Sequence, residues 1–222
     1  MDVKKIRRIY YTAVILGSFA IGIAAPALGL SSGARAAVII LWLAAVGISA
    51  LIVNMRWLKG LNAEVTSLTP LFDSDPDLYI ERLTALLGGR RSKPLRQLLA
   101  INTAAACCRK KDYAKAEELL RSIGGRGLYG VYRPVHQADL ALCLFYQGRY
   151  DDALAVMDEN RGLFGANAEN PQLGGLLAVL GLFELTAKGE YSKALELLPE
   201  ARAKWGERCR DDLDYIERLC RK

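Results

Sequence analysis

Two long apolar segments stand out near the N-terminus of an otherwise amphipathic sequence. Residues 9–30 and residues 36–55 contain no charged side chain. A helix rises about 1.5 Å per residue, so each segment is long enough to cross a bilayer core of about 30 Å. The link at residues 31–35 is so short that the two helices must run antiparallel. We therefore predict a transmembrane helical hairpin over residues 1–60, with spans at about 9–30 and 36–55.

After residue 60, apolar residues recur at helical spacing almost to the C-terminus. No segment shows the alternation of apolar and polar residues that is typical of a strand. The protein is therefore predicted to be all-α, with a second domain over residues 61–222. Pro199 is expected to interrupt a helix, and the last helix is expected to form a polar end cap. The predicted helices cover residues 77–87, 94–109, 113–123, 134–146, 150–160, 172–187, 191–204 and 207–220.

The net charge of +6 lies entirely around the apolar segments. Residues 1–59 hold seven basic residues and one acidic residue, whereas residues 60–222 hold 23 of each. A neutral domain argues against nucleic-acid binding, which requires a basic surface. Basic residues precede the first segment and follow the second, and the positive-inside rule then puts both ends of the hairpin in the cytoplasm.

A cleaved signal peptide is the alternative interpretation of the first segment, because Ala25-Pro26-Ala27 follows a basic tail and an apolar run. In both interpretations residues 61–222 lie in the cytoplasm, at a bacterial-type inner membrane. The five cysteines include no Cys-x-x-Cys pair, as expected of reduced thiols in that compartment.

One turn sequence occurs three times in the predicted helical domain, and its tyrosines are 37 and 41 residues apart. Each copy follows an apolar helix of about four turns and precedes an amphipathic helix. Three copies indicate an internal structural repeat rather than a coincidence of composition. The copies are Lys-Asp-Tyr-Ala-Lys-Ala at 111–116, Gly-Arg-Tyr-Asp-Asp-Ala at 148–153 and Gly-Glu-Tyr-Ser-Lys-Ala at 189–194.

These units resemble the tetratricopeptide-repeat (TPR) family, whose 34-residue motif pairs two antiparallel helices around a turn reading Gly-Asp-Tyr-x-x-Ala. The resemblance implies a TPR-like α-solenoid. It departs from the pattern in the third unit, where Leu182 replaces a small residue. It assigns small residues to helix crossings and tyrosines to the turns, as repeat-packing positions: Ala104, Tyr113, Ala116, Ala141, Tyr150, Ala153, Tyr191 and Ala194.

The first helices of such repeats line a concave groove that binds peptides or helices. The set of Lys and Asn residues with which some family members hold a terminal carboxylate is not matched. The corresponding positions are mostly apolar, and two interpretations stay open: an apolar binding groove, or part of the protein core. The resemblance assigns Ile101, Cys108, Arg109, Leu142, Phe145, Tyr146, Val179 and Phe183 to these positions.

The residues suited to catalysis or metal binding form no recognisable constellation. His136, the single histidine, is expected at a helix start in a solvated or capping role. The acidic pairs Asp151-Asp152 and Asp211-Asp212 are expected in the first turns of helices, where they favour the helix dipole. We therefore predict no catalytic residue, no metal site and no cofactor.

The sequence favours a non-catalytic, membrane-anchored adaptor or scaffold that binds a protein partner at the cytoplasmic face of the membrane. Its expected partners are a peptide or helix and the lipid bilayer, but not nucleic acid. The alternative is a membrane-assembly or envelope factor that acts through the transmembrane hairpin, with the helical domain as an oligomerisation module.

Overall fold

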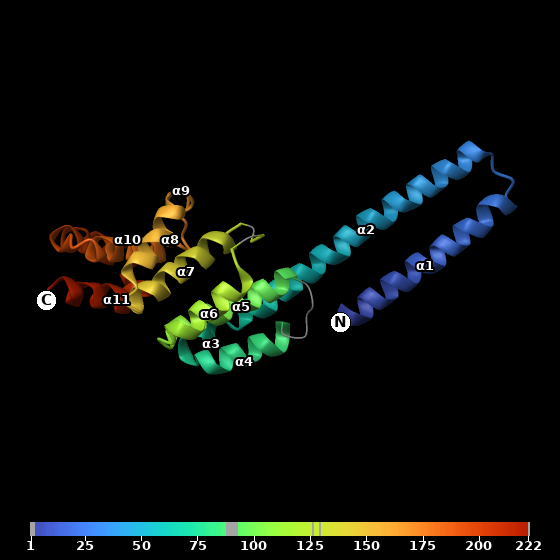
Figure 1. The fold of residues 1–222 in the computed structure, drawn as a ribbon. Coiled ribbons are helices and arrows are strands. Elements are labelled where there is room, and N and C mark those ends of the chain that lie inside the picture. Colours follow the sequence, from blue (N-terminus) through green and yellow to red (C-terminus); the bar gives the residue numbers. More distant parts are fainter. Residues whose placement is uncertain (1–2, 88–92, 126, 129, 222) are drawn as a thin grey trace. The chain divides into compact units, whose positions relative to one another are not determined.

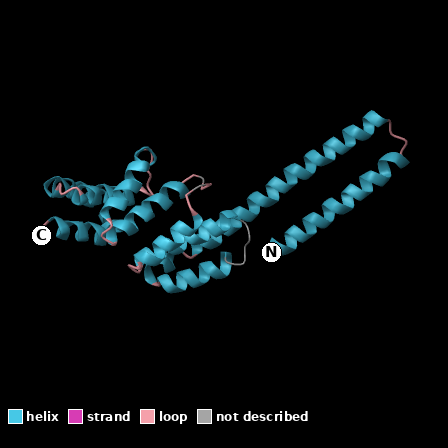
Figure 2. Cartoon of the chain, viewed as in Figure 1, coloured by secondary structure: helices cyan, strands magenta, loops and turns pink. Residues whose placement is uncertain are grey.

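The computed structural model describes residues 3–87, 93–125, 127–128 and 130–221, and these contain helices but no strand (Figures 1 and 2). The predicted all-α class is thereby confirmed for the part of the chain that is described. The helices are α1 (Val3–Ala27), α2 (Ser32–Ser67), α3 (Thr69–Ser74), α4 (Pro76–Leu87), α5 (Lys93–Arg109), α6 (Tyr113–Ile123), α7 (Tyr132–Tyr146), α8 (Tyr150–Glu159), α9 (Arg161–Gly165), α10 (Gly174–Ala187) and α11 (Tyr191–Cys220).

The chain divides into two compact units, Met1–Ser67 and Leu68–Lys222. The boundary therefore lies after residue 67, whereas the sequence suggested residue 60. The reason is that α2 continues without a break from its apolar part through Gly60 to Ser67. No proline occurs between residues 33 and 67, and a single glycine costs a helix only about 1 kcal/mol.

In the first unit α1 and α2 lie side by side and run in opposite directions. Tyr10 donates a hydrogen bond to the carbonyl oxygen of Val46 at 2.8 Å, and Trp42 Nε1 donates one to Ser18 Oγ at 3.1 Å. A Cβ atom at Gly17 would lie 2.4 Å from the Trp42 ring, so this contact requires a glycine.

The connection between α1 and α2 occupies residues 28–31, so the link predicted at 31–35 was placed too far along the chain. Gly29 makes the turn with φ of +67°. Arg35 lies inside α2, and its Nε donates to the carbonyl oxygen of Leu30 at 2.7 Å. This bond explains how a charged residue can occupy the first turn of a helix that is otherwise apolar for several turns.

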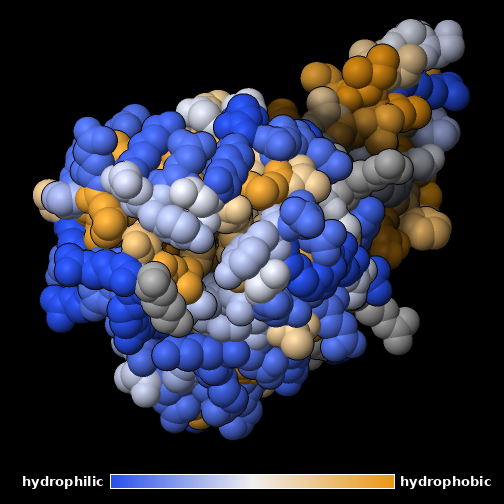
Figure 3. Space-filling view, turned by 60° about the vertical axis from the view of Figure 1, so that its left-hand side comes forward, coloured by the Kyte–Doolittle hydropathy of each residue, from blue (hydrophilic) through white to orange (hydrophobic). Residues whose placement is uncertain are grey.

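The apolar side chains of the first unit point outward. Phe19 is 68% exposed, and both helices are long and apolar enough to cross a membrane. Apolar surface dominates the visible part of this unit in Figure 3, whereas on the visible face of the second unit apolar patches lie between larger areas of hydrophilic surface. Water is a poor solvent for such helices, whereas the hydrocarbon of a bilayer would accommodate them.

In the second unit consecutive helices pack in pairs, α5 with α6, α7 with α8, and α10 with α11. The first helices of the pairs also contact one another, α5 with α7 and α7 with α10. Small residues lie where helices approach closely. Five of these alanines are almost completely buried: Ala104, Ala116, Ala141, Ala153 and Ala194.

The three repeated turns have the same backbone geometry. Lys111, Gly148 and Gly189 all adopt positive φ, at 62°, 73° and 76°. In each turn this residue and the next one donate backbone hydrogen bonds to the end of the preceding helix, and the tyrosine then begins the following helix. The internal repeat that was inferred from sequence is therefore also a repeat of backbone conformation.

The turn tyrosines differ in their surroundings. Tyr113 stacks on Tyr146 with ring centroids 4.3 Å apart, and Tyr150 lies 6.4 Å from the ring of Phe145. Tyr191 is 47% exposed. The third turn thus lacks the enclosed space that the first one has.

Three features of the second unit differ from the sequence-based expectation. The short helices α3 and α9 were not predicted. Pro199 does not interrupt α11, so that prediction was wrong; burial of Ala194 and Leu198 holds the helix together across the missing N–H group. The break in α11 lies instead at Cys209, which has non-helical φ of −113° and ψ of 19°.

Candidate functional site

A groove of about 690 Å³ in the second unit is lined by side chains of α3, α5, α7, α10 and α11. This volume is in the range of ligand-binding pockets. The groove combines aromatic, charged and thiol side chains, among them Cys108, Arg109, Asp139, Tyr146, Arg208 and Asp212.

The eight positions assigned to a partner groove divide into two sets. Four of them are buried in the core: Ile101, Phe145, Val179 and Phe183. The other four, Cys108, Arg109, Leu142 and Tyr146, line the groove just described, although Leu142 is also part of the buried core. Only this second set therefore lies along the groove, whereas the first set is enclosed in the core.

The C-terminal part of α11 explains why Phe183 is covered. Beyond the break at Cys209, the ring of Tyr215 lies 5.1 Å from Tyr146 and 6.1 Å from Phe183. Tyr146 donates its hydroxyl hydrogen to Asp212. This segment, expected to be a polar end cap, buries Leu213 and Ile216 against the repeats. The chain thus fills one end of the surface that the first helices form.

Asp139 on α7 is the most unusual polar residue in the groove. It is only 6% exposed, and no hydrogen bond from the described residues reaches its Oδ2 atom. Burial raises the pKa of this carboxyl to about 7. The sequence analysis missed this residue, although a single acid within the apolar run at 138–145 was a visible signal.

Two thiols lie beside this carboxyl. The sulfur atoms of Cys108 on α5 and Cys143 on α7 are 3.4 Å apart. Their hydrogen bond and burial raise the pKa of Cys108 far above its usual value, so the thiol stays protonated. A protonated thiol is a poor nucleophile and a poor metal ligand.

The remaining candidates for chemistry serve the structure. Within the described residues, no group of three or more His, Cys, Asp or Glu side chains is arranged to hold a metal ion. Asp151 and Asp152 lie in the first turn of α8 as expected. Asp211 and Asp212 directly follow the break at Cys209 and so lie in the first turn of the C-terminal part of α11, as expected.

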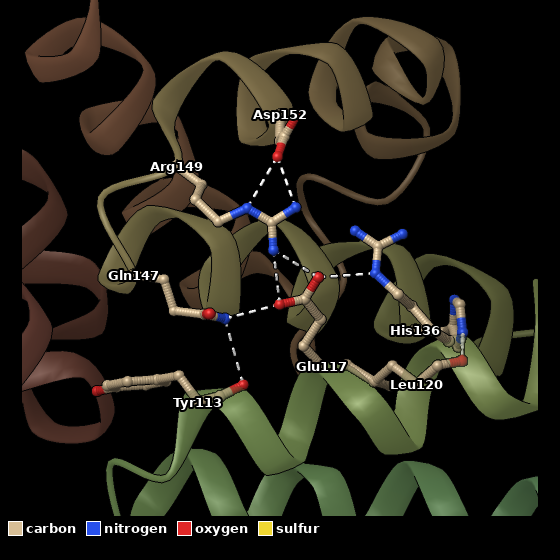
Figure 4. Close-up of polar contacts among 8 residues, drawn as sticks. Tyr113, Glu117, Leu120, His136, Gln147, Arg149 and Asp152 are labelled. Carbon is tan, nitrogen blue, oxygen red and sulfur yellow. Dashed lines mark hydrogen bonds and ion pairs between the residues drawn. The ribbon is translucent and has the colours of Figure 1, made fainter.

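His136 is buried, so the expectation of a solvated histidine was wrong, and its capping contact is with the end of α6 rather than with its own helix. Its Nε2 donates to the carbonyl oxygen of Leu120 at 2.9 Å (Figure 4). Burial lowers the pKa of the imidazole. A neutral imidazole with one nitrogen bound to the end of α6 connects two helices rather than serving as an accessible base.

A buried acid connects the first repeat to the second. Glu117 on α6 accepts hydrogen bonds from Arg121 Nε at 2.7 Å, Gln147 Nε2 at 2.9 Å and Arg149 Nη1 at 2.8 Å. In Figure 4 the guanidinium of Arg149 lies between Glu117 and Asp152. Burial alone raises the pKa of Glu117, but these three donors outweigh it and lower the pKa.

The repeated turns, the groove and the polar connection between repeats are therefore properties established from this chain alone. A comparison with protein-family models, with curated proteins and with solved structures finds no match to the chain.

Proposed function

We propose that the protein is a membrane-anchored adaptor whose TPR-like α-solenoid binds a protein partner at the cytoplasmic face of the membrane. The observation that carries the proposal is the groove between α5, α7 and α11, which remains open although the C-terminal segment covers Phe183. A groove between the first helices of stacked repeats is where such domains bind peptides.

The anchor in this proposal is the pair α1 and α2, inserted as a transmembrane hairpin. Its exposed apolar side chains and its contacts through Gly17 and Trp42 support this role. The basic residues at both ends support an orientation with the N-terminus and the second unit in the cytoplasm.

Site-specific photo-crosslinking tests the adaptor function. A benzophenone amino acid replaces Ala105, a half-buried residue of the groove, and in a second protein it replaces Glu118, an exposed residue of α6 outside the groove. Irradiation of intact membranes is expected to give a discrete protein adduct from position 105 only. Equal adducts from both positions, or none from either, would count against a partner in the groove.

A second apolar surface favours the alternative function. A cavity of about 420 Å³ between α10 and α11 is lined by Leu177, Leu182, Leu185, Leu197 and Trp205. Leu197 is 43% exposed there, and exposed apolar surface of this kind suits contact with another protein chain. In this alternative the second unit is an oligomerisation module, and the hairpin carries the function.

Exchanging the anchor separates the two functions. Residues 1–56 are replaced by an unrelated two-span anchor, and Leu197→Glu is introduced separately. An adaptor keeps its Ala105 adduct in both proteins. An assembly factor loses its cellular function with the foreign anchor and loses its oligomer, measured by mass in detergent, with Leu197→Glu.

A further inference from the structure

Asp139 lacks a partner for a carboxylate oxygen that is removed from water. An unpaired buried carboxyl is costly, and native proteins usually pair such groups. The residue lines the groove, so a cationic group bound there lies next to its carboxyl group, while Oδ2 itself is enclosed by protein.

The cations of the groove do not supply that partner. Arg109 pairs with Asp73 at 2.8 Å, and Arg208 Nη1 donates to the carbonyl oxygen of Pro171 at 2.7 Å. No donor among the described residues reaches Asp139 Oδ2. The missing group is therefore a hydrogen-bond donor, and a positively charged donor makes the strongest bond to a carboxylate.

The surroundings of Asp139 suit the side chain of a basic amino acid. Leu142, Tyr146 and Leu176 line the same groove and offer apolar contact. Lysine and arginine carry a charged group on an apolar stem, which packs well along such a wall.

We propose that the groove binds a partner protein through one lysine or arginine side chain, whose cationic group pairs with the carboxylate of Asp139. This inference rests on the proposed adaptor function and names the chemistry of the partner. It is the reverse of a groove that holds a terminal carboxylate, because here the acidic group belongs to the repeat domain.

The test uses the full-length protein in detergent micelles and two pools of acetylated, amidated octapeptides. One pool has lysine at a fixed central position, and the other has norleucine, which matches the alkyl stem without the charge. The remaining positions are random but uncharged. We expect immobilised protein to retain the lysine pool about tenfold or more over the norleucine pool, as expected for a buried charge pair.

Two variants locate the effect. Asp139→Asn should abolish the preference for lysine, because the amide keeps the shape of the carboxyl but not its charge. Asp151→Asn removes an exposed acid of α8 that lies outside the groove and should leave the preference unchanged. A preference that survives Asp139→Asn, or that disappears equally in Asp151→Asn, overturns the proposal.

The comparison of the two peptide pools on the native protein tests the proposal without any variant, so it stays informative even if a variant fails to fold. Equal retention of the two pools by the native protein overturns the inference. A third outcome is retention of the lysine pool only after the basic N-terminal tail is neutralised. It would mean that the chain's own tail occupies the groove in the native protein, and it would overturn the proposal that a partner supplies the lysine. That variant carries glutamine at Lys4, Lys5, Arg7 and Arg8.

Failure of this inference is distinguishable from failure of the adaptor function. If the Ala105 adduct persists in Asp139→Asn membranes while the native protein shows no preference for lysine, the groove binds a protein by other contacts. If no adduct forms at position 105, the adaptor function itself fails.

Discussion

The two units of this protein are both helical, but their large apolar side chains face opposite ways. In the first unit the large apolar side chains face outward, and small or polar groups such as Gly17 and Ser18 make the contact between helices. In the second unit the apolar side chains face inward, and charged groups cover the outside. Both units share the helical period, so the period alone does not show whether a helix suits water or an apolar environment. The number and spacing of charged residues are the better indicator.

The largest difference between the two units is expected when one phenylalanine ring is removed from each and the unfolding free energy is measured. Phe183→Ala leaves a cavity in the core and should lower the unfolding free energy of the second unit by about 3–5 kcal/mol. Phe19→Ala, at an exposed position of α1, should leave that value unchanged. Urea denaturation in micelles, followed by circular dichroism, measures both. Comparable losses would show that the two units unfold as one.

The pH dependence of stability should reveal the carboxyl of Asp139, whose Oδ2 atom is buried and receives no hydrogen bond from the described residues. The pKa of Asp139 is raised from 3.8 to about 7, so the folded state keeps a proton that the unfolded state releases. The unfolding free energy contributed by this group is therefore full at low pH and falls by up to about 4 kcal/mol as the pH rises from about 4 to 7.

Asp139→Asn should remove this loss, so the variant should gain stability over the native protein as the pH rises. The quantity to measure is the difference in unfolding free energy between the native protein and Asp139→Asn at each pH. Other groups near the groove, such as Asp212, Cys108 and Cys143, are present in both proteins, so their effects cancel in this difference. A difference that stays flat from acid to neutral pH would mean that Asp139 is solvated or paired.

The polar connection between repeats should contribute less than the core. Glu117→Ala removes the acceptor of Arg121, Gln147 and Arg149 and should destabilise the second unit by about 2 kcal/mol. Glu118→Ala, the exposed neighbour on α6, should have an effect near zero. Chemical denaturation of both variants makes the comparison, and equal effects would mean that Glu117 does not connect the repeats.

The smallest effect is expected at the one repeated turn that lacks glycine. Lys111 has φ of 62°, a conformation that costs a residue with a side chain about 1 kcal/mol. Lys111→Gly should therefore stabilise the second unit by roughly that amount. Gly148→Ala should destabilise it similarly, since no atom lies within 4 Å of the added methyl group and only the backbone opposes it. Thermal unfolding resolves the two signs, and a loss of stability in Lys111→Gly would contradict the prediction.

Local chemistry made much of the fold predictable from sequence. The repeated turns placed three helix starts correctly, at Tyr113, Tyr150 and Tyr191, because a left-handed residue ends one helix and the next begins two residues later. The same local reasoning failed at Pro199. There the cost of a proline in a helix was outweighed by packing that a pattern does not reveal.

The candidate site was only half predictable. Cys108, Arg109, Leu142 and Tyr146 followed from their position on the first helices of the repeats. Asp139 did not, because the sequence does not say whether an acid in an apolar helix meets water, a cation or nothing. Nor did the sequence show that Tyr215 would cover Phe183.

By itself the sequence determined the helical class, the two apolar segments, the charge that surrounds them and the repeated turns, because each depends on residues that are close together along the chain. Only the tertiary structure decided that α11 breaks at Cys209 and folds back, that His136 is buried, and that Asp139 lines the groove with no described residue bonded to its Oδ2 atom. These three features depend on which distant segments of the chain pack together. Burial between such segments determines the free-energy cost of each polar side chain enclosed there.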